Sequence, residues 1–171
     1  MPDLVLSVSC TTREPRPGEV DGRDYRFVSN RDFDRLIEDR AFLEWAEIYG
    51  HRSGTLWGPV VAELDEGRDV VLEIDVQGAR TVRDRVPDAV LVFLSPPSLH
   101  ELERRLRARR SENEAQVSRR LAAAAEEMKA ASWFDHVVVN DHLDRAAAEV
   151  AAIIGGARTG ASPPEVEHPD A

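Results

Sequence analysis

The distribution of apolar residues along the chain predicts four buried strands. Each run is short and largely apolar, which is typical of strands in the interior of a sheet. The runs are Leu4–Ser9, Val70–Asp75, Ala89–Leu94 and His136–Val139. Helical patterns separate the last three runs, and strands that alternate with helices indicate an α/β fold with a mainly parallel sheet.

Apolar residues recur at helical spacing between and after these runs. One helix opens with a capping box, in which Glu101 lies three residues after Ser98. Two glycines end the last helix, and residues 155–171, rich in Gly, Ala, Pro and acidic residues, are predicted to form a disordered acidic tail. The predicted helices are Gln77–Val86, Ser98 to about Arg110, Glu114–Ala131 and Leu143–Ile154.

Residues 23–57 do not follow this alternation. Tyr25–Val28 and Phe42–Ile48 are short strand-like segments on either side of a helical Asn30–Asp39. We therefore expect a small mixed insertion on the parallel core, within one compact domain that occupies residues 1–154.

Composition narrows the possible functions. The 171 residues are 42% hydrophobic, enough for a core, and their net charge of −10 disfavours nucleic-acid binding. The single cysteine, Cys10, excludes an internal disulfide and a cysteine-based zinc site, and His136 and His142 lack a third ligand at metal spacing. No apolar run approaches the length of a membrane span, and residues 1–9 lack the features of a signal peptide. We expect a cytoplasmic protein without a membrane partner.

The segment Ser9–Glu19 carries the densest chemical signal. It follows a predicted buried strand directly, and ligands of open α/β sheets bind beyond the carboxyl ends of strands. Arg13 and Arg16 lie in this proline-punctuated loop, where two guanidinium groups can grip a phosphate. The alternative is a solvated turn with surface arginines, which the flanking Ser/Thr run and prolines disfavour.

Two further segments place carboxylates on or after strands. Glu44 lies on one face of Phe42–Glu47, where a carboxylate can accept two N–H bonds from a guanine edge; the alternative is an edge-strand charge. Glu73 and Asp75 end the second apolar run, where a ligand crevice is expected. The alternative for Asp75 is an N-cap of the next helix.

Arginines are concentrated in one predicted helix and after it. A short polar segment flanked by arginines is suited to a lid over polyphosphate, because phosphoryl transfer needs positive charge on the moving group. The alternative is a solvated helix in which the arginines pair with nearby glutamates. The arginines are Arg104, Arg105, Arg107, Arg109, Arg110, Arg119 and Arg120.

Together these motifs resemble the guanylate kinase family, which transfers the γ-phosphate of ATP to GMP, giving GDP. The resemblance spans about Leu4–Ile154 and rests on several motifs in the same order, including Ser7–Glu19, Phe42–Glu47, Glu73–Gly78 and Arg105–Arg120. It implies a P-loop-kinase-like parallel sheet flanked by helices, with a GMP-binding insertion at about residues 23–57 and a lid at about 109–120.

The resemblance also implies roles for single residues. Those implied to hold the GMP phosphate are Arg13, Arg16 and Tyr25. Those implied to read the guanine are Ser9, Glu44, Thr55 and Asp75. Those implied to stabilise charge on the transferring phosphoryl group are Arg105, Arg109 and Arg120, with Glu73 near that group and the Mg²⁺ that accompanies ATP. Asn140 is implied to face the adenine of ATP.

The sequence departs from the family pattern in three places. Ser53 stands where the family usually has a phosphate-binding tyrosine, and Arg110 stands where the lid normally has glycine. A P-loop is absent from the sequence, since the only lysine, Lys129, lies in a predicted helix. The first strand, P-loop and first helix are therefore expected to be missing, and the chain is interpreted as an N-terminally truncated kinase deficient in ATP binding. A non-catalytic module that binds GMP or a protein is the alternative.

Overall fold

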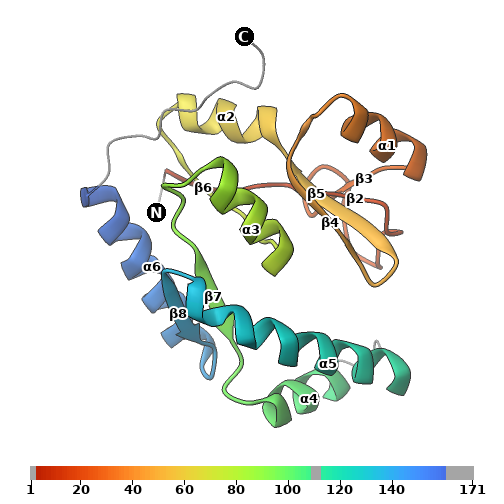
Figure 1. The fold of residues 1–171 in the computed structure, drawn as a ribbon, viewed down its shortest axis with the longest axis vertical. Coiled ribbons are helices and arrows are strands. Elements are labelled where there is room, and N and C mark those ends of the chain that lie inside the picture. The colour runs from red at the N-terminus through yellow and green to blue at the C-terminus, as the bar shows by residue number, and fades with distance from the viewer. Residues whose placement is uncertain (1–2, 109–112, 161–171) are drawn as a thin grey trace. The chain divides into compact units, whose positions relative to one another are not determined.

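The computed structural model describes residues 3–108 and 113–160. The described chain divides into two compact units, the first reaching Ala89 and the second beginning at Val90. Figure 1 shows the elements of both units in chain order. None of the helices in these residues is long and apolar enough to cross a membrane.

A parallel strand pair forms one part of the first unit. Strand β1 (Leu4–Leu6) pairs with β6 (Asp69–Val71), and Ser7 N–H donates the last bond of this ladder to Val71 O at 3.0 Å. Both strands were predicted, but β6 ends four residues earlier than expected because residues 72–75 turn into the start of α3 (Val76–Arg85). The polar residues Glu73 and Asp75 therefore lie after the strand.

The second part of this unit is a mixed four-stranded sheet with one helix. The strand order is β3 (Arg26–Phe27), β2 (Cys10–Thr11), β5 (His51–Leu56) and β4 (Phe42–Ile48), and only β2 and β3 are parallel. Helix α1 (Asn30–Glu38) begins at the N-cap Ser29, and the Phe33 ring stacks on Phe42 with centroids 4.5 Å apart. The short strands and helix expected within residues 23–57 are thus present.

Two elements of the first unit were not predicted. Strand β5 is polar along most of its length and is held by pairing with β2 on one side and β4 on the other. Helix α2 (Trp57–Asp65) contains Gly58 and Pro59 in its first turn, and both residue types argue against a helix when only the sequence is considered. A proline is tolerated there because the N–H groups in the first turn of a helix have no acceptor within the helix, so the N–H that proline lacks removes no bond.

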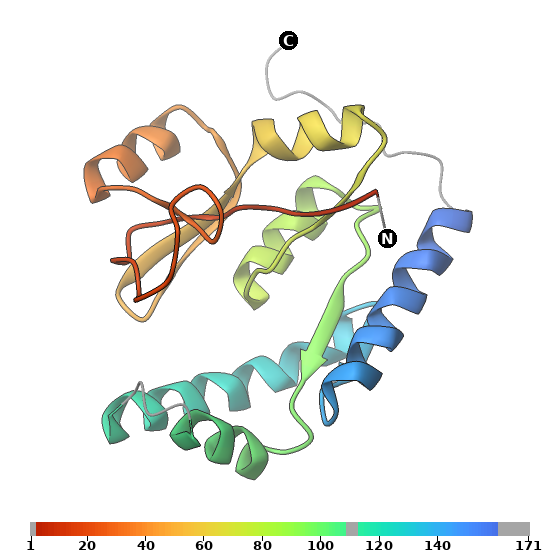
Figure 2. The same ribbon diagram turned by 180° about the vertical axis from the view of Figure 1, so that it is seen from behind.

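The second unit contains one parallel strand pair and the remaining helices. Strand β7 (Val92–Ser95) pairs with β8 (His136–Val139) from Val92↔His136 to Ser95↔Val139. Helices α4 (Leu99–Ala108) and α5 (Glu114–Ala130) lie side by side in both ribbon views (Figures 1 and 2). A 3₁₀ turn (Ala131–Trp133) follows α5, and helix α6 (Leu143–Gly160) follows β8.

The predicted start of the tail at residue 155 is wrong. Helix α6 continues through Gly155 and Gly156 to Gly160, and neither of the first two glycines has a positive φ. A glycine destabilises a helix by about 1 kcal/mol relative to alanine, which the alanines and isoleucines around it can offset. The remainder of the predicted tail, residues 161–171, lies outside the described residues.

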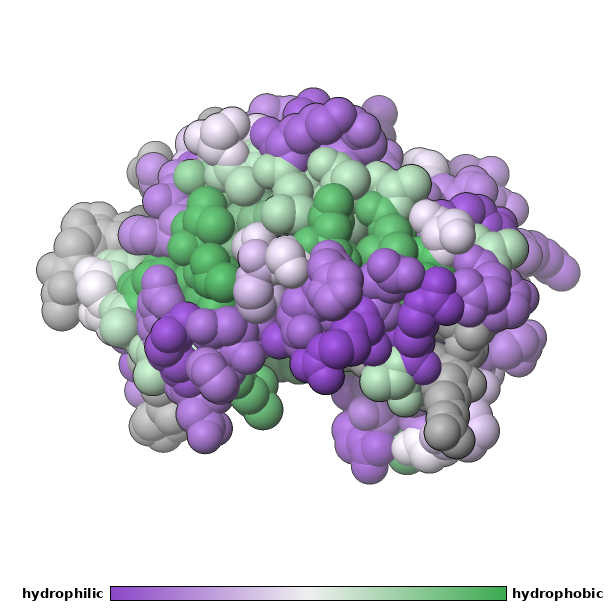
Figure 3. Space-filling model, turned by 90° about the horizontal axis from the view of Figure 1, so that it is seen from below, coloured by the Kyte–Doolittle hydropathy of each residue, from purple (hydrophilic) through white to green (hydrophobic). Residues whose placement is uncertain are grey.

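Several large apolar side chains on the parallel strands are exposed. Leu6 on β1, Leu94 on β7 and Val137 on β8 are 60%, 53% and 47% exposed. Apolar side chains also gather on the face shown in Figure 3, where polar side chains border them. Each parallel pair has outer backbone edges without a ladder partner in the part of the chain that the structure describes.

Candidate active site

The loop between β2 and β3, defined here as the arginine loop (Thr12–Tyr25), is organised by Glu19. Arg13 donates from Nη1 to Glu19 Oε2 and from Nη2 to Glu19 Oε1, both at 2.9 Å, and Arg16 N–H donates to Oε2 at 2.6 Å. These bonds, those from Arg13 first, hold the pKa of the Glu19 carboxyl below its ordinary value. The Glu19 carboxylate therefore holds the side chain of Arg13 and the backbone of Arg16, the two arginines that the sequence singled out.

Arg13 is also held by aromatic rings. Its guanidinium carbon lies 5.2 Å from the centroid of Tyr25 and 5.8 Å from that of Phe27. Nη1 additionally donates to Glu14 O at 2.7 Å, but Nε makes no hydrogen bond with a described residue. The structure thus brings Arg13 and Tyr25 together. The bond to Glu19 has the larger effect in raising the pKa of Arg13 above its ordinary value, and the interaction with Tyr25 helps to raise it.

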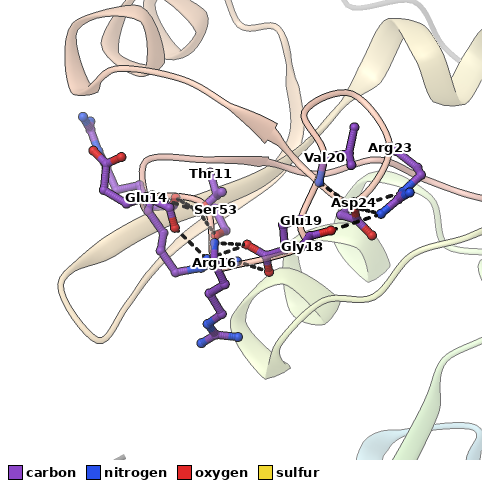
Figure 4. Close-up of polar contacts among 11 residues, drawn as sticks. Thr11, Glu14, Arg16, Gly18, Glu19, Val20, Arg23, Asp24 and Ser53 are labelled. Carbon is purple, nitrogen blue, oxygen red and sulfur yellow. Dashed lines mark hydrogen bonds and ion pairs between the residues drawn. The ribbon is translucent and has the colours of Figure 1, made fainter. Parts of the chain in front are cut away.

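Arg16 differs from Arg13 in having a free side chain. Only its backbone N–H bonds to Glu19, and its guanidinium points away from that carboxylate without a hydrogen bond or ion pair to any described residue (Figure 4). A free, exposed guanidinium next to a restrained one suits the binding of a mobile anion, because each can donate to a different oxygen.

Ser53 belongs to a hydroxyl network under the same loop (Figure 4). Its Oγ donates to Thr11 Oγ1 at 3.0 Å, and Thr11 Oγ1 in turn donates to Arg52 O at 3.1 Å. Thr11 Oγ1 also accepts the N–H of Arg13 at 3.3 Å. The Ser53 hydroxyl therefore supports the backbone of the loop and is not bonded to the Arg13 guanidinium.

Glu44 on β4 is buried, with only 5% of its surface exposed. Its Oε1 accepts the N–H of Thr55 on the neighbouring strand β5 at 2.8 Å. Burial raises the pKa of the Glu44 carboxyl above its ordinary value, and the charge of Asp75 raises it further. Interpreting Glu44 as an edge-strand charge for solubility is therefore wrong, since a solubility charge would be exposed.

Thr55 is buried beside this carboxylate. Its hydroxyl lies near enough to Glu44 to lower the pKa of that carboxyl, yet Thr55 Oγ1 makes no hydrogen bond with any described residue. A buried hydroxyl without a partner is unfavourable, so a ligand atom that bonded to it would gain free energy.

Asp75 is the N-cap of α3, which was the alternative interpretation of this residue. Its Oδ1 accepts the N–H of Gly78 at 2.8 Å. The other oxygen, Oδ2, accepts from Gln77 Nε2 at 3.3 Å, and the charge of Asp75 adds to burial in raising the pKa of the Glu44 carboxyl. Glu73 is exposed in the segment between β6 and α3, and the backbone O of Ser9 accepts the N–H of Arg26 at 2.9 Å.

A small cavity adjoins the buried end of this region. It has a volume of about 230 Å³ and is lined mainly by β1 and α2, with Thr55 and Leu56 at the end of β5. None of Arg13, Arg16, Glu44 and Asp75 lines it. The cavity therefore lies beside the candidate residues and does not unite them.

The arginines of α4 mostly pair with glutamates, as the alternative interpretation proposed. Arg105 donates to Glu101 Oε1 and Asn140 O, both at 2.8 Å, and to Asp141 O at 3.3 Å, so it joins α4 to the end of β8. Bonds from Arg104 and then Arg105 lower the pKa of Glu101 to about 2. Arg107 pairs with Glu103 and Glu114.

The other residues assigned to phosphoryl transfer are only partly described. Arg120 lies half-buried on α5, whereas Arg109 and Arg110 lie outside the described residues. Of the predicted lid, residues 114–120 form the first turns of α5, which opens with a capping box between Asn113 and Gln116. No group of three or more His, Cys, Asp or Glu side chains in the described ranges could hold a metal ion by itself.

Sequence analysis missed two residues of this site. Glu19 lies within the Ser9–Glu19 segment, after both arginines. Its negative charge so close to them in the sequence could have suggested that it pairs with one of them. Gly78 was within the Glu73–Gly78 motif, but only the structure shows that its backbone lies against Glu44.

Comparisons with known proteins agree on one family. The family model "Guanylate kinase" matches residues 3–157. Guanylate kinase of Nocardia farcinica is 52% identical over 155 residues, which are 90% of this chain and 80% of that protein. Guanylate kinase of Caldanaerobacter subterraneus subsp. tengcongensis is 49% identical over 152 residues, 89% and 74% of the two chains. A crystal structure of guanylate kinase from Anaplasma phagocytophilum has a TM-score of 0.81 and 31% identity, covering 95% of this chain and 80% of that one.

Proposed function

Because the chain belongs to the guanylate kinase family, we propose that it binds GMP through its first unit as the acceptor of the γ-phosphate of ATP. In that reaction an oxygen of the GMP phosphate bonds to the γ-phosphorus, the bond to the bridging oxygen breaks, and ADP leaves. The observation that carries the proposal is the buried carboxylate of Glu44 beside the partnerless hydroxyl of Thr55.

The arginine loop would bind the phosphate of GMP. Arg16 offers a guanidinium without a bond to any described residue, and Arg13 would donate beside it, with Tyr25 lying against Arg13. Two guanidinium groups neutralise most of the charge of a phosphate monoester and match the geometry of its oxygens. Both arginines belong to one loop and are held by the same carboxylate, Arg13 through its side chain and Arg16 through its backbone N–H, which supports this assignment.

The buried end of the sheet would read the base. Guanine presents two N–H groups along one edge, and an ionised carboxylate has lone pairs to accept both. Glu44 would accept these bonds, with Thr55, Asp75 and Ser9 as further polar groups of the base site. An adenine would leave the buried carboxylate without these donors, which is strongly unfavourable.

The second unit would act on the donor side. Arg109 and Arg120 would stabilise charge on the phosphoryl group, and Asn140 would face the adenine of ATP. Arg105 keeps a supporting contact with the backbone O of Asn140, and it would have to release part of its present bonding to reach a phosphate. Mg²⁺ would arrive with ATP as part of that substrate, near Glu73.

The 171 residues by themselves would transfer phosphate poorly. The sequence contains no Gly-Lys pair and hence no P-loop to bind the ATP phosphates. The position of Ser53, whose hydroxyl bonds to Thr11 Oγ1 and not to the Arg13 guanidinium, favours a second candidate function, a module that binds GMP or a protein without phosphate transfer.

Calorimetric titration with GMP tests the acceptor site, and a coupled assay for ADP release tests transfer. We expect GMP binding that weakens by about 10- to 100-fold in Arg13→Ala, because charge-assisted hydrogen bonds contribute about 1.5–3 kcal/mol. ADP release is expected near background until a P-loop segment from a relative is fused ahead of Asp3. Absence of GMP binding would contradict the acceptor site, and efficient turnover without the fusion would contradict the donor deficiency.

A further inference from the structure

Gly78, in the first turn of α3, lies directly against the buried carboxylate of Glu44. A Cβ built on Gly78 would lie 2.6 Å from Glu44 Oε2 and 3.2 Å from Glu44 Cδ, although real Cβ contacts are essentially never shorter than 3.0 Å. The φ of Gly78 is not positive, so the backbone conformation does not require glycine. The space that a side chain would need is the space that Glu44 occupies.

Hydrogen bonds on both sides fix this close approach. Asp75 Oδ1 accepts the N–H of Gly78 at 2.8 Å, which sets the first turn of α3. On the other side, Thr55 N–H donates to Glu44 Oε1 at 2.8 Å, which anchors one oxygen of the carboxylate. The second oxygen, Oε2, lies against Gly78, so a side chain at position 78 would displace a carboxylate that is buried and already anchored.

We propose that Gly78 is a specificity-determining residue, whose missing side chain lets Glu44 hold the position in which its carboxylate accepts both N–H groups of guanine. This inference rests on the proposed function, because it takes Glu44 as the reader of the base. Gly78 does not touch the reacting atoms, and it acts through Glu44 as a positioning residue. The discriminated ligands are purine nucleoside monophosphates that differ in N–H groups at this edge.

Gly78→Ala tests the inference, with Gly58→Ala as the matched control. Gly58 also lies in the first turn of a helix without a positive φ, but a Cβ there would meet nothing within 4 Å. Affinities for GMP, IMP and ribose 5-phosphate are measured by titration calorimetry. IMP lacks the 2-amino group of GMP, and ribose 5-phosphate lacks the base, so the three ligands separate base reading from phosphate binding.

We expect Gly78→Ala to weaken GMP binding by about tenfold, the equivalent of one charge-assisted hydrogen bond. IMP binding should weaken less, and ribose 5-phosphate binding should be unchanged, so the preference for GMP over IMP falls. Gly58→Ala should leave all three affinities within about twofold, since surface substitutions have small effects. A Gly78→Ala variant that keeps the full preference for GMP over IMP would overturn the inference.

The double variant with Gly78→Ala and Glu44→Ala tests whether the effect of the added Cβ comes from the Glu44 carboxylate or from other neighbours. The added Cβ would also lie 3.2 Å from Ile74 Cβ, and that contact remains in the double variant. If the carboxylate is the cause, adding Gly78→Ala to Glu44→Ala changes GMP affinity and melting temperature little, even where Gly78→Ala alone fails to fold. Equal damage in both backgrounds would overturn the inference. If the wild-type chain shows no preference for GMP over IMP, the proposed reading of the base fails first.

Discussion

The two ends of the proposed GMP site handle charge in opposite ways. In the arginine loop the charged groups are partly exposed and neutralise one another, with Arg13 and Glu19 each 19% exposed at the side chain. At the base end Glu44 is 5% exposed and receives one hydrogen bond, from a backbone N–H. The pKa of Glu19 is accordingly lowered, mainly by Arg13, and that of Glu44 is raised, mainly by burial.

This difference suggests how each end would discriminate. In the arginine loop Arg13 and Glu19 are already paired before a ligand binds, so the loop can accept different phosphates with little change. A buried carboxylate destabilises the free protein until donors reach it, so it favours a ligand that brings two donors and penalises one that brings none. We therefore expect the loop to bind different phosphate monoesters with similar affinity, and Glu44 to supply the selection of the base together with a large share of the affinity for GMP.

The largest effect is expected at the base end. Glu44→Gln should weaken GMP binding by about 100-fold, because two charge-assisted hydrogen bonds of about 1.5 kcal/mol each are lost. The same substitution removes a buried charge and should raise the melting temperature. Titration with GMP and ribose 5-phosphate, together with calorimetric unfolding, checks both effects.

Glu47→Gln is the control for this prediction, since Glu47 lies on the same strand but is exposed. It should change neither measurement appreciably. If Glu44→Gln also abolished ribose 5-phosphate binding, the two ends would not be separable and the comparison would fail.

A smaller effect is expected from Glu19→Gln. Removing a negative charge beside Arg13 should strengthen phosphate binding on charge alone. We expect the opposite, a weakening of about three- to tenfold, because the two bonds from Arg13 to the Glu19 carboxylate are lost and the Arg13 guanidinium is no longer held in place. Titration with ribose 5-phosphate gives the sign, and Glu14→Gln in the same loop is the control. Stronger binding would mean that Glu19 competes with the phosphate.

Lowering the pH should weaken the binding of GMP severalfold more than the binding of ribose 5-phosphate. Guanine binding needs ionised Glu44, so it should weaken as pH falls through the raised pKa of that carboxyl, while Glu19 stays ionised. The folded state binds the extra proton in this window, so the contribution of Glu44 to stability increases as pH falls. Because the phosphate also titrates near pH 6, the measured quantity is the ratio of GMP to ribose 5-phosphate affinity. In Glu44→Gln this ratio should not change with pH. A ratio that also stayed constant in the wild type would contradict the role of Glu44 in binding guanine.

Sequence analysis predicted elements that depend on local pattern and missed those that depend on neighbours. The apolar runs of β1, β7 and β8 and the helix α3 were found because each carries its own signal. Strand β5 has no such signal, since its residues are polar and its pairing partners are β2 and β4. Helix α6 was predicted to end at Ile154 because two successive glycines commonly end a helix, whereas it continues to Gly160.

The site divides in the same way. The nearness of Arg13 and Tyr25 was expected from the resemblance, because it implies that both hold the phosphate of GMP. The contact of Gly78 with Glu44 joins two motifs far apart in the sequence, and no spacing rule predicts it. The bond from Arg105 to the backbone O of Asn140 likewise spans 35 residues, so an arginine expected to bind phosphate has a structural partner that its own helix could not indicate.

The smallest effect is expected from Ser53→Ala, at the support of the arginine loop. The Ser53 hydroxyl bonds to Thr11 Oγ1 and not to the Arg13 guanidinium, and Thr11 keeps its bonds to Arg52 O and Arg13 N without it. Ribose 5-phosphate and GMP affinities should therefore fall by less than about twofold, since a neutral hydrogen bond at a partly exposed site contributes little. A tenfold loss would mean that Ser53 contacts the phosphate. Phosphate binding would then depend on Ser53 as well as on the arginine loop, and the loop could not be compared with Glu44 on its own.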